Sequence, residues 1–329
     1  MRHSLSLLAG ALLCLACNHP HPLPTEVFFA SDSFSPDSLA NLYPQPVFTL
    51  VTPADTVLFE SLSTHFKELS SWDATLEAIG CSPSSGKPLF ASFLTPRYRV
   101  YDFIDDETEA LYEQVMASLP DYQIRLIASD EGKHNLLVEA SDDRTPKIWY
   151  NYDCDSMRTT LIHAPSQISL RRHLSPVVPV TFQARDNTQL HGYLTLPHGA
   201  KADAQPRLHA IVMPHAFGAP ADRWEYNAEV QFLANRGLAV LQVEYRDVSA
   251  DSTISADEAR EQAIHDVRDA ANWLVQNGIA NHRKVFYHVH DDLPYAAADR
   301  MFRDPAFTRV IDHRQRIAFY NDMADKATH

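Results

Sequence analysis

The second half of the chain alternates short apolar runs with amphipathic stretches. Three apolar runs have the length of a buried strand, and two stretches between them have apolar residues at helical spacing. In chain order these segments are Leu208–Met213, a helical stretch from about 225 to 236, Leu238–Val243, a helical stretch from about 257 to 276, and Lys284–His288. Strands that alternate with helices predict a parallel sheet with crossover helices.

Two further runs, Val177–Ala184 and Leu190–Leu196, come just before this alternation. The turn formers Asp186 and Asn187 lie between them, so the pair predicts a β-hairpin. The chain is thus predicted to enter the parallel sheet through a hairpin.

The first half has a different pattern of short runs rich in β-branched and aromatic residues. Turn formers separate six such runs, at Leu89–Phe93, Tyr98–Phe103, Gln123–Ala128, Asn135–Ala140, Lys147–Tyr152 and Thr159–His163. Helical spacing predicts one helix over Asp106–Leu119 and another around Leu58 to Leu69. The runs predict antiparallel strands, too few to close a β-propeller ring.

The first seventeen residues have the pattern of an export signal. A short basic start precedes the apolar run Leu5–Ala16, which is too short to span a bilayer, and Cys17 follows Ala16 as in bacterial lipoprotein signals. We expect residues 1–17 to be a signal peptide, Cys17 to carry lipid, and the protein to be periplasmic or anchored to the membrane through that lipid only. Residues 18–56 lack periodicity and predict an irregular tether.

Composition and charge exclude some partners. The chain has 329 residues, of which 45% are hydrophobic and 21% charged, as in globular proteins. Its formal charge of −14 argues against nucleic-acid binding, and no motif calls for a cofactor. Cys81 and Cys154 either pair as a disulfide or remain separate thiols, and the sequence leaves both possibilities open.

A resemblance rests on a colinear series of motifs in the second half. They are Thr181–Asp186, His191–Pro197, Met213–His215, Gln231–Gly237, Ala239–Gln242 with Tyr245-Arg246, Asp266-Val267 and Trp273-Leu274 with Gly278–Ala280. In these motifs the chain resembles the prolyl oligopeptidase family of serine peptidases, especially its bacterial dipeptidyl-peptidase and acylaminoacyl-peptidase-like members. The resemblance implies an incomplete α/β-hydrolase domain over 176–329 and, over 57–175, a β-rich fragment similar to the end of a β-propeller. It also implies peptides as the ancestral substrate class.

The nucleophile position is where the chain departs from this family. The family motif places a serine between glycines on a sharp turn after a strand, whereas Tyr287–Ala297 has neither glycine nor serine and His290 stands at the serine's place. The oxyanion loop is also altered, with Ala216 and Phe217 after His215. The family's acidic residue and histidine would fall beyond the last residue of this sequence. We therefore expect no catalytic residues and no peptidase activity.

Two alternatives stay open. His288, His290 and Asp292 place metal-ligand side chains close together, which would give a hydrolase with an unconventional metal site. Alternatively, the N-terminal half is a periplasmic binding or interaction module that the hydrolase-like half supports. His215 either shapes an oxyanion loop or is a structural histidine bonded to nearby backbone.

The parallel sheet is predicted to stop after its middle strands, and this affects the expected stability and self-association of the protein. A parallel sheet that stops after its middle strands has an exposed edge and an uncovered apolar face. We accordingly expect marginal stability or self-association through that edge.

Overall fold

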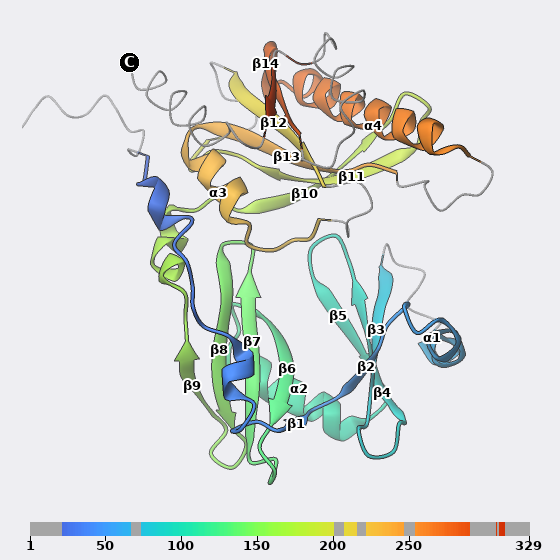
Figure 1. Ribbon diagram of the computed structural model, residues 1–329, viewed down its shortest axis with the longest axis vertical. Coiled ribbons are helices and arrows are strands. Elements are labelled where there is room, and N and C mark those ends of the chain that lie inside the picture. The colour runs from blue at the N-terminus through green and yellow to red at the C-terminus, as the bar shows by residue number, and fades with distance from the viewer. Residues whose placement is uncertain are drawn as a thin grey trace, which may run out of the picture.

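A computed structural model describes residues 22–66, 74–200, 207–215, 222–246, 254–289, 307 and 309–312. Figure 1 shows a mixed sheet with two helices at one end of the molecule and two antiparallel sheets side by side at the other. We call these the αβ part and the β part. The fold is a mixed α/β arrangement with two antiparallel sheets and one mixed sheet.

The two sheets of the β part confirm the predicted antiparallel strands. The five-stranded sheet has the order β1-β6-β7-β8-β9 and the four-stranded sheet the order β2-β3-β4-β5. Their bounds are β1 Gln45–Pro46, β2 Thr49–Val51, β3 Thr75–Cys81, β4 Pro88–Leu94, β5 Arg99–Phe103, β6 Gln123–Ser129, β7 Asn135–Asp142, β8 Thr145–Asp153 and β9 Arg158–His163.

Strand β3 was not predicted, because Glu77 and Gly80 break its apolar pattern. Gly80 reads as a turn former in the sequence, yet a Cβ at this position would lie 2.1 Å from the Phe90 ring on β4. The glycine therefore allows Phe90 to pack flat against the neighbouring strand.

Helix α2 (Asp106–Ser118) confirms the predicted helix and closes the core of the β part. The side chain of Asp105 accepts a hydrogen bond from the Thr108 backbone N–H at 2.9 Å and caps the helix. Tyr112 and Val115 on its inner face pack with Phe90 and with strands β6 and β7.

Residues 22–56 differ from the irregular tether that we expected. Short 3₁₀ turns occur at Thr25–Val27 and Pro36–Leu39, and β1 and β2 join one antiparallel sheet each. Phe28 is buried in the αβ part, with its ring 5.7 Å from that of Phe232. Arg236 donates to the carbonyl oxygen of Leu23 at 2.9 Å. The segment therefore ties both parts together, and α1 (Thr56–Ser63) with a 3₁₀ turn at Thr64–Phe66 follows it.

The mixed sheet of the αβ part has the order β10-β11-β13-β12-β14-β15. Strands β10 and β11 form the predicted hairpin, β11 pairs antiparallel with β13, and the remaining neighbours are parallel. The bounds are β10 Val177–Gln183, β11 Gln189–Thr195, β12 Leu208–Pro214, β13 Leu238–Glu244, β14 Ala280–Val289 and β15 Arg309–Asp312. Strand β15 was not predicted, and it adds a neighbour to β14.

Helices α3 (Ala228–Asn235) and α4 (Ala256–Gln276) are the predicted crossovers and cover opposite faces of this sheet. Ile211, Met213 and Val240 pack with α3, whereas the alternate residues Val212 and Leu241 pack with α4. Both faces of the parallel strands are therefore apolar, as their continuous hydrophobic runs require. A 3₁₀ segment, Ser166–His173, links the two parts.

Two further expectations concern cysteines and membranes. Cys81 and Cys154 are free thiols: Cys81 is buried in the four-stranded sheet, and Cys154 packs against the core that α2 closes. Within the described segments, no helix is long and apolar enough to cross a membrane. Cys17 lies outside the described residues.

Candidate functional site

The structure separates the residues that the sequence singled out. His215 follows β12, and its Nε2 lies 4.0 Å from the Glu244 carboxylate while its ring stacks on Tyr245 at 4.3 Å. His288 lies on β14 and is fully buried, with Nε2 3.6 Å from the carboxylate of Glu229 in the first turn of α3. His290 and Asp292 lie outside the described residues.

The metal interpretation gains no support from these positions. His288 shares the strand face of Phe286 and is buried beneath α3, and it is not among the described residues that line the cavity presented below. Among the residues that the structure describes, no group of three or more His, Cys, Asp or Glu side chains has the arrangement of a metal site.

Polar residues continue the α3-facing side of the sheet beyond the end of that helix. Gln242 and Glu244 have the same strand parity as Val240, and in the antiparallel register they lie opposite Tyr193 and His191. The side chain of His215 lies against Glu244 at the end of β12. These side chains gather where the parallel strands end, which is the usual place for ligands in such sheets.

Asp222 joins this group from the segment ahead of α3. Its backbone N–H donates to Glu244 Oε1 at 2.8 Å. Burial raises the pKa of Glu244 to about 8, and the nearby charge of Asp222 adds to the rise. Burial also raises the pKa of Asp222 to about 6, against the opposing effects of His215 and of a hydrogen bond with Gln242. The two carboxyls therefore form a partly protonated pair at neutral pH.

A cavity of about 690 Å³ lies between the two parts, and Asp222 and Glu244 are in one of its walls. Tyr193, Asp222, Glu225 and Glu244 line it on the side of the αβ part, together with His191. The size is in the range of small-molecule binding sites, which is ~300–1,000 Å³. We call this side of the cavity the acidic wall.

The opposite wall is the polar face of the five-stranded sheet. Arg125 on β6, Glu139 on β7 and Lys147 on β8 point to the same face, since alternate residues of a strand share a side. Arg125 and Lys147 both contact the Glu139 carboxylate, at 3.3 and 3.6 Å. Two cations against one carboxylate leave a net positive charge, so we call this side the basic wall.

An ion-pair chain closes one side of the cavity by joining the two parts. The Glu77 carboxylate on β3 accepts two hydrogen bonds from the Arg99 guanidinium, at 2.5 and 2.9 Å, and one from Arg223 of the αβ part at 2.8 Å. Burial of Glu77 opposes its charge, but the two arginines outweigh this effect and hold its pKa below the ordinary value. Beside this chain, the guanidinium of Arg97 lies over the rings of Tyr98 and Trp224.

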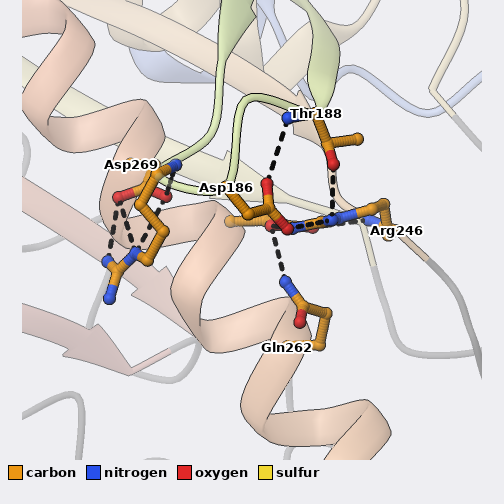
Figure 2. Close-up of polar contacts among 7 residues, drawn as sticks. Asp186, Thr188, Arg246, Gln262 and Asp269 are labelled. Carbon is orange, nitrogen blue, oxygen red and sulfur yellow. Dashed lines mark hydrogen bonds and ion pairs between the residues drawn. The ribbon is translucent and has the colours of Figure 1, made fainter.

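A second ionic network fixes the end of β13 and so holds Glu244 in place. The backbone N–H and Nε of Arg246 donate hydrogen bonds to the Asp266 carboxylate on α4, at 3.0 and 2.9 Å. Its Nη1 donates a hydrogen bond to Asp186 of the hairpin turn at 2.6 Å. Figure 2 shows Arg246 in contact with Asp186 and Thr188, while Asp269 makes a separate contact with the hairpin. These bonds clamp the hairpin turn, the end of β13 and α4 together.

Sequence reasoning missed most of the cavity. The acidic wall had a usable signal, since Glu244 is a charged residue at the end of the apolar run 238–243, where a parallel strand presents its carboxyl end. Arg125, Glu139 and Lys147 had none, because alternating charged residues also mark an ordinary solvent-exposed sheet face.

Comparison with known proteins gives distant and partial similarities. No family model matches the chain. Dipeptidyl aminopeptidase BIII from Pseudoxanthomonas mexicana is 29% identical over 204 residues, which are 56% of this chain and 29% of that protein. The chain thus spans less than a third of the length of this relative.

Two solved structures are similar at low identity. Oligopeptidase B from Trypanosoma brucei has a TM-score of 0.46 at 12% identity, with 73% of this chain and 35% of that chain covered. Prolyl oligopeptidase B from Galerina marginata, solved with a 25mer macrocyclization substrate, has a TM-score of 0.45 at 14% identity, with 66% and 30% covered.

Proposed function

Because the chain is a distant relative of the prolyl oligopeptidase-family peptidases over part of their length, we propose that it binds short peptides without cleaving them. The proposal treats the αβ part as a hydrolase-type sheet and the β part as propeller-type blades. The observation that carries it is the cavity of about 690 Å³ beside the carboxyl ends of the parallel strands.

The lack of cleavage follows from the sequence around β14. In an α/β-hydrolase the nucleophile sits on the turn after a core strand, and β14 is such a strand, with β12 and β15 as parallel neighbours. Its continuation, His290-Asp291-Asp292-Leu293-Pro294, has no serine or cysteine. Loss of the nucleophile alone removes most of the rate acceleration of a catalytic triad.

Peptide binding is supported by the two walls of the cavity. Hydrogen-bonding side chains such as Gln123, Ser141 and Tyr193 line it together with the charged groups. A peptide backbone has a donor and an acceptor at each residue and needs such partners when it is enclosed.

The test combines turnover, labelling and binding on the purified protein. We expect no hydrolysis of aminoacyl or dipeptidyl p-nitroanilides, no reaction with a fluorophosphonate probe, and saturable calorimetric binding of tetraalanine. Hydrolysis with probe labelling would overturn the inactive part of the proposal. Absence of any tetraalanine binding would overturn the peptide-binding part.

We also propose that the chain is exported and lipidated at Cys17, on the strength of the Leu5–Ala16 run alone. The expected result is incorporation of radiolabelled palmitate in a bacterial host and its loss in Cys17→Ala. Equal labelling of both proteins, or none in either, would contradict the proposal.

A further inference from the structure

The two walls of the cavity carry opposite charge, and this polarity is a property that neither wall has alone. The acidic wall has three carboxyl groups, from Asp222, Glu225 and Glu244. The basic wall has Arg125 and Lys147 against the single carboxylate of Glu139. A ligand that lies across the cavity is therefore exposed to an electric field directed from one wall to the other.

The basic wall keeps donors for a ligand. Glu139 is buried and is held between the two cations, whereas the side chains of Arg125 and Lys147 remain 40% and 58% exposed. An arginine has five N–H donors and a lysine three, so one carboxylate does not saturate them. A ligand carboxylate can bind here by charge-assisted hydrogen bonds.

The acidic wall favours a cation for a complementary reason. Asp222 and Glu244 lie next to each other, joined by the Asp222 backbone N–H, and each is buried enough to resist ionisation. A bound ammonium group would relieve the repulsion between the two carboxylates and stabilise their charged forms. The groups that face this pair are His191 and Tyr193 from β11, His215 from the end of β12, and Arg223 and Glu225 from the segment ahead of α3.

We propose that the cavity binds a short peptide as a zwitterion, with the free N-terminal amine at Asp222 and Glu244 and the free C-terminal carboxylate at Arg125 and Lys147. This inference rests on the proposed peptide binding and adds an orientation and a requirement for two free ends. Such a site excludes internal segments of proteins and selects the small products of peptide breakdown.

The first experiment compares three probes by calorimetry on the purified protein at pH 7: tetraalanine, N-acetyl-tetraalanine and tetraalanine amide. Blocking either end is expected to weaken binding at least tenfold. Equal affinity for all three would overturn the zwitterion inference while leaving peptide binding intact. No binding of any probe would overturn both.

The second experiment assigns each end to its wall. Glu244→Gln is expected to remove the preference for a free amine and to keep the preference for a free carboxylate, while Lys147→Met or Arg125→Gln should do the reverse. Lys87→Met, an exposed lysine outside the cavity, is the matched control and should bind as the wild type does. Melting temperatures identify any variant that fails to fold. Loss of the carboxylate preference in Glu244→Gln, with loss of the amine preference in Lys147→Met or Arg125→Gln, would overturn the proposed orientation of the peptide.

A proton balance provides an independent readout. Binding of the amine should ionise Glu244, so tetraalanine binding at pH 7 should release a proton, seen as a dependence of the binding heat on the ionisation enthalpy of the buffer. N-acetyl-tetraalanine, and tetraalanine with Glu244→Gln, should release less. Equal release in all three cases would contradict the placement of the amine.

Discussion

Arg246 with its partners Asp266 and Asp186, which we call the clamp, and the acidic wall are two groups of charged side chains at the same sheet. They differ in whether each carboxylate lies next to a cation or next to another carboxyl group. Asp266 is fully buried and accepts three hydrogen bonds from Arg246. Glu244 is only two residues before Arg246, yet its neighbours include a second carboxyl, and burial raises its pKa to about 8. Removing one partner of a matched buried pair destabilises a fold, whereas a carboxyl group with a raised pKa that lines a cavity is a candidate for ligand binding.

The largest expected effect is loss of the matched charge in the clamp. Asp266→Asn removes the fully buried negative charge that faces Arg246 and leaves this arginine, whose side chain is 23% exposed, with one charged partner fewer. Breaking such a pair costs about 3 kcal/mol of unfolding free energy. Urea unfolding measures this loss, and the exposed Glu113→Gln on α2 serves as the control. A loss of unfolding free energy no larger than that of the control would contradict the stabilising role of the Arg246–Asp266 pair.

The next effect concerns Glu244 and has the opposite sign. The ordinary pKa of a glutamate is 4.5, and that of Glu244 is about 8 when the protein is folded. The favourable contribution of its protonated form is complete below pH 4.5 and is lost as the pH rises through 8. Glu244→Gln stays neutral and keeps an oxygen acceptor, so above pH 8 it should be more stable than the wild type by on the order of 2 kcal/mol.

Unfolding curves from pH 4 to pH 9 measure this effect. The stabilities of Glu244→Gln and the wild type should converge at pH 4 and diverge as the pH rises. A constant difference over the whole range would show that Glu244 does not change its ionisation on folding.

A smaller effect is expected at the edge of the clamp. Asp269 on α4 binds the backbone N–H of Arg185 at 2.8 Å and its guanidinium at 2.8 to 3.2 Å, and the arginine is 41% exposed. Asp269→Asn should therefore destabilise the protein by about 1 kcal/mol, as for a well-oriented but partly solvated pair. A loss as large as that of Asp266→Asn would mean that solvent exposure does not weaken the pair.

The smallest effect is expected at Asp186, on the hairpin turn. Its carboxylate accepts a hydrogen bond from Nη1 of Arg246 at the surface, where water competes with the pair. Asp186→Asn should lower the melting temperature slightly at low salt, and the difference should vanish near ~1 M NaCl, where charges are screened within ~3 Å. A difference that survives high salt would place Asp186 with the buried part of the clamp.

Local pattern was enough to predict the elements. The pattern of apolar residues predicted α2, α3, α4 and eleven of the strands, β4 to β14, because these segments have apolar residues at helical spacing or in short continuous or alternating runs. Strand β3 was not predicted, because Gly80 is required by the ring of Phe90, a residue 10 positions further along the chain. The pairing of residues 22–56 with both parts was not predicted either, because β1 and β2 are two and three residues long and are too short to have a detectable period.

The candidate site was less accessible. The sequence directed attention to His288 and His290, because a motif with a missing serine is visible in one continuous segment. The cavity instead combines β6, β7 and β8 with β11, β13 and the segment before α3, and no continuous segment contains its two walls. Trp224 also lines the cavity, and its indole N–H donates a hydrogen bond to the Val177 carbonyl oxygen at 2.8 Å.

By itself, the sequence determined which segments form strands and helices, the hairpin that leads into a parallel sheet, the family resemblance, and the lack of a serine at the expected turn. These properties depend on neighbours a few residues apart or on a fixed order of motifs. Only the tertiary structure decided that His288 is buried beneath α3, that Glu244 is buried beside the carboxyl group of Asp222, and that a basic wall faces an acidic one. Each of these depends on burial and on charges brought together from distant segments, because the pKa of a side chain is set by its surroundings in space.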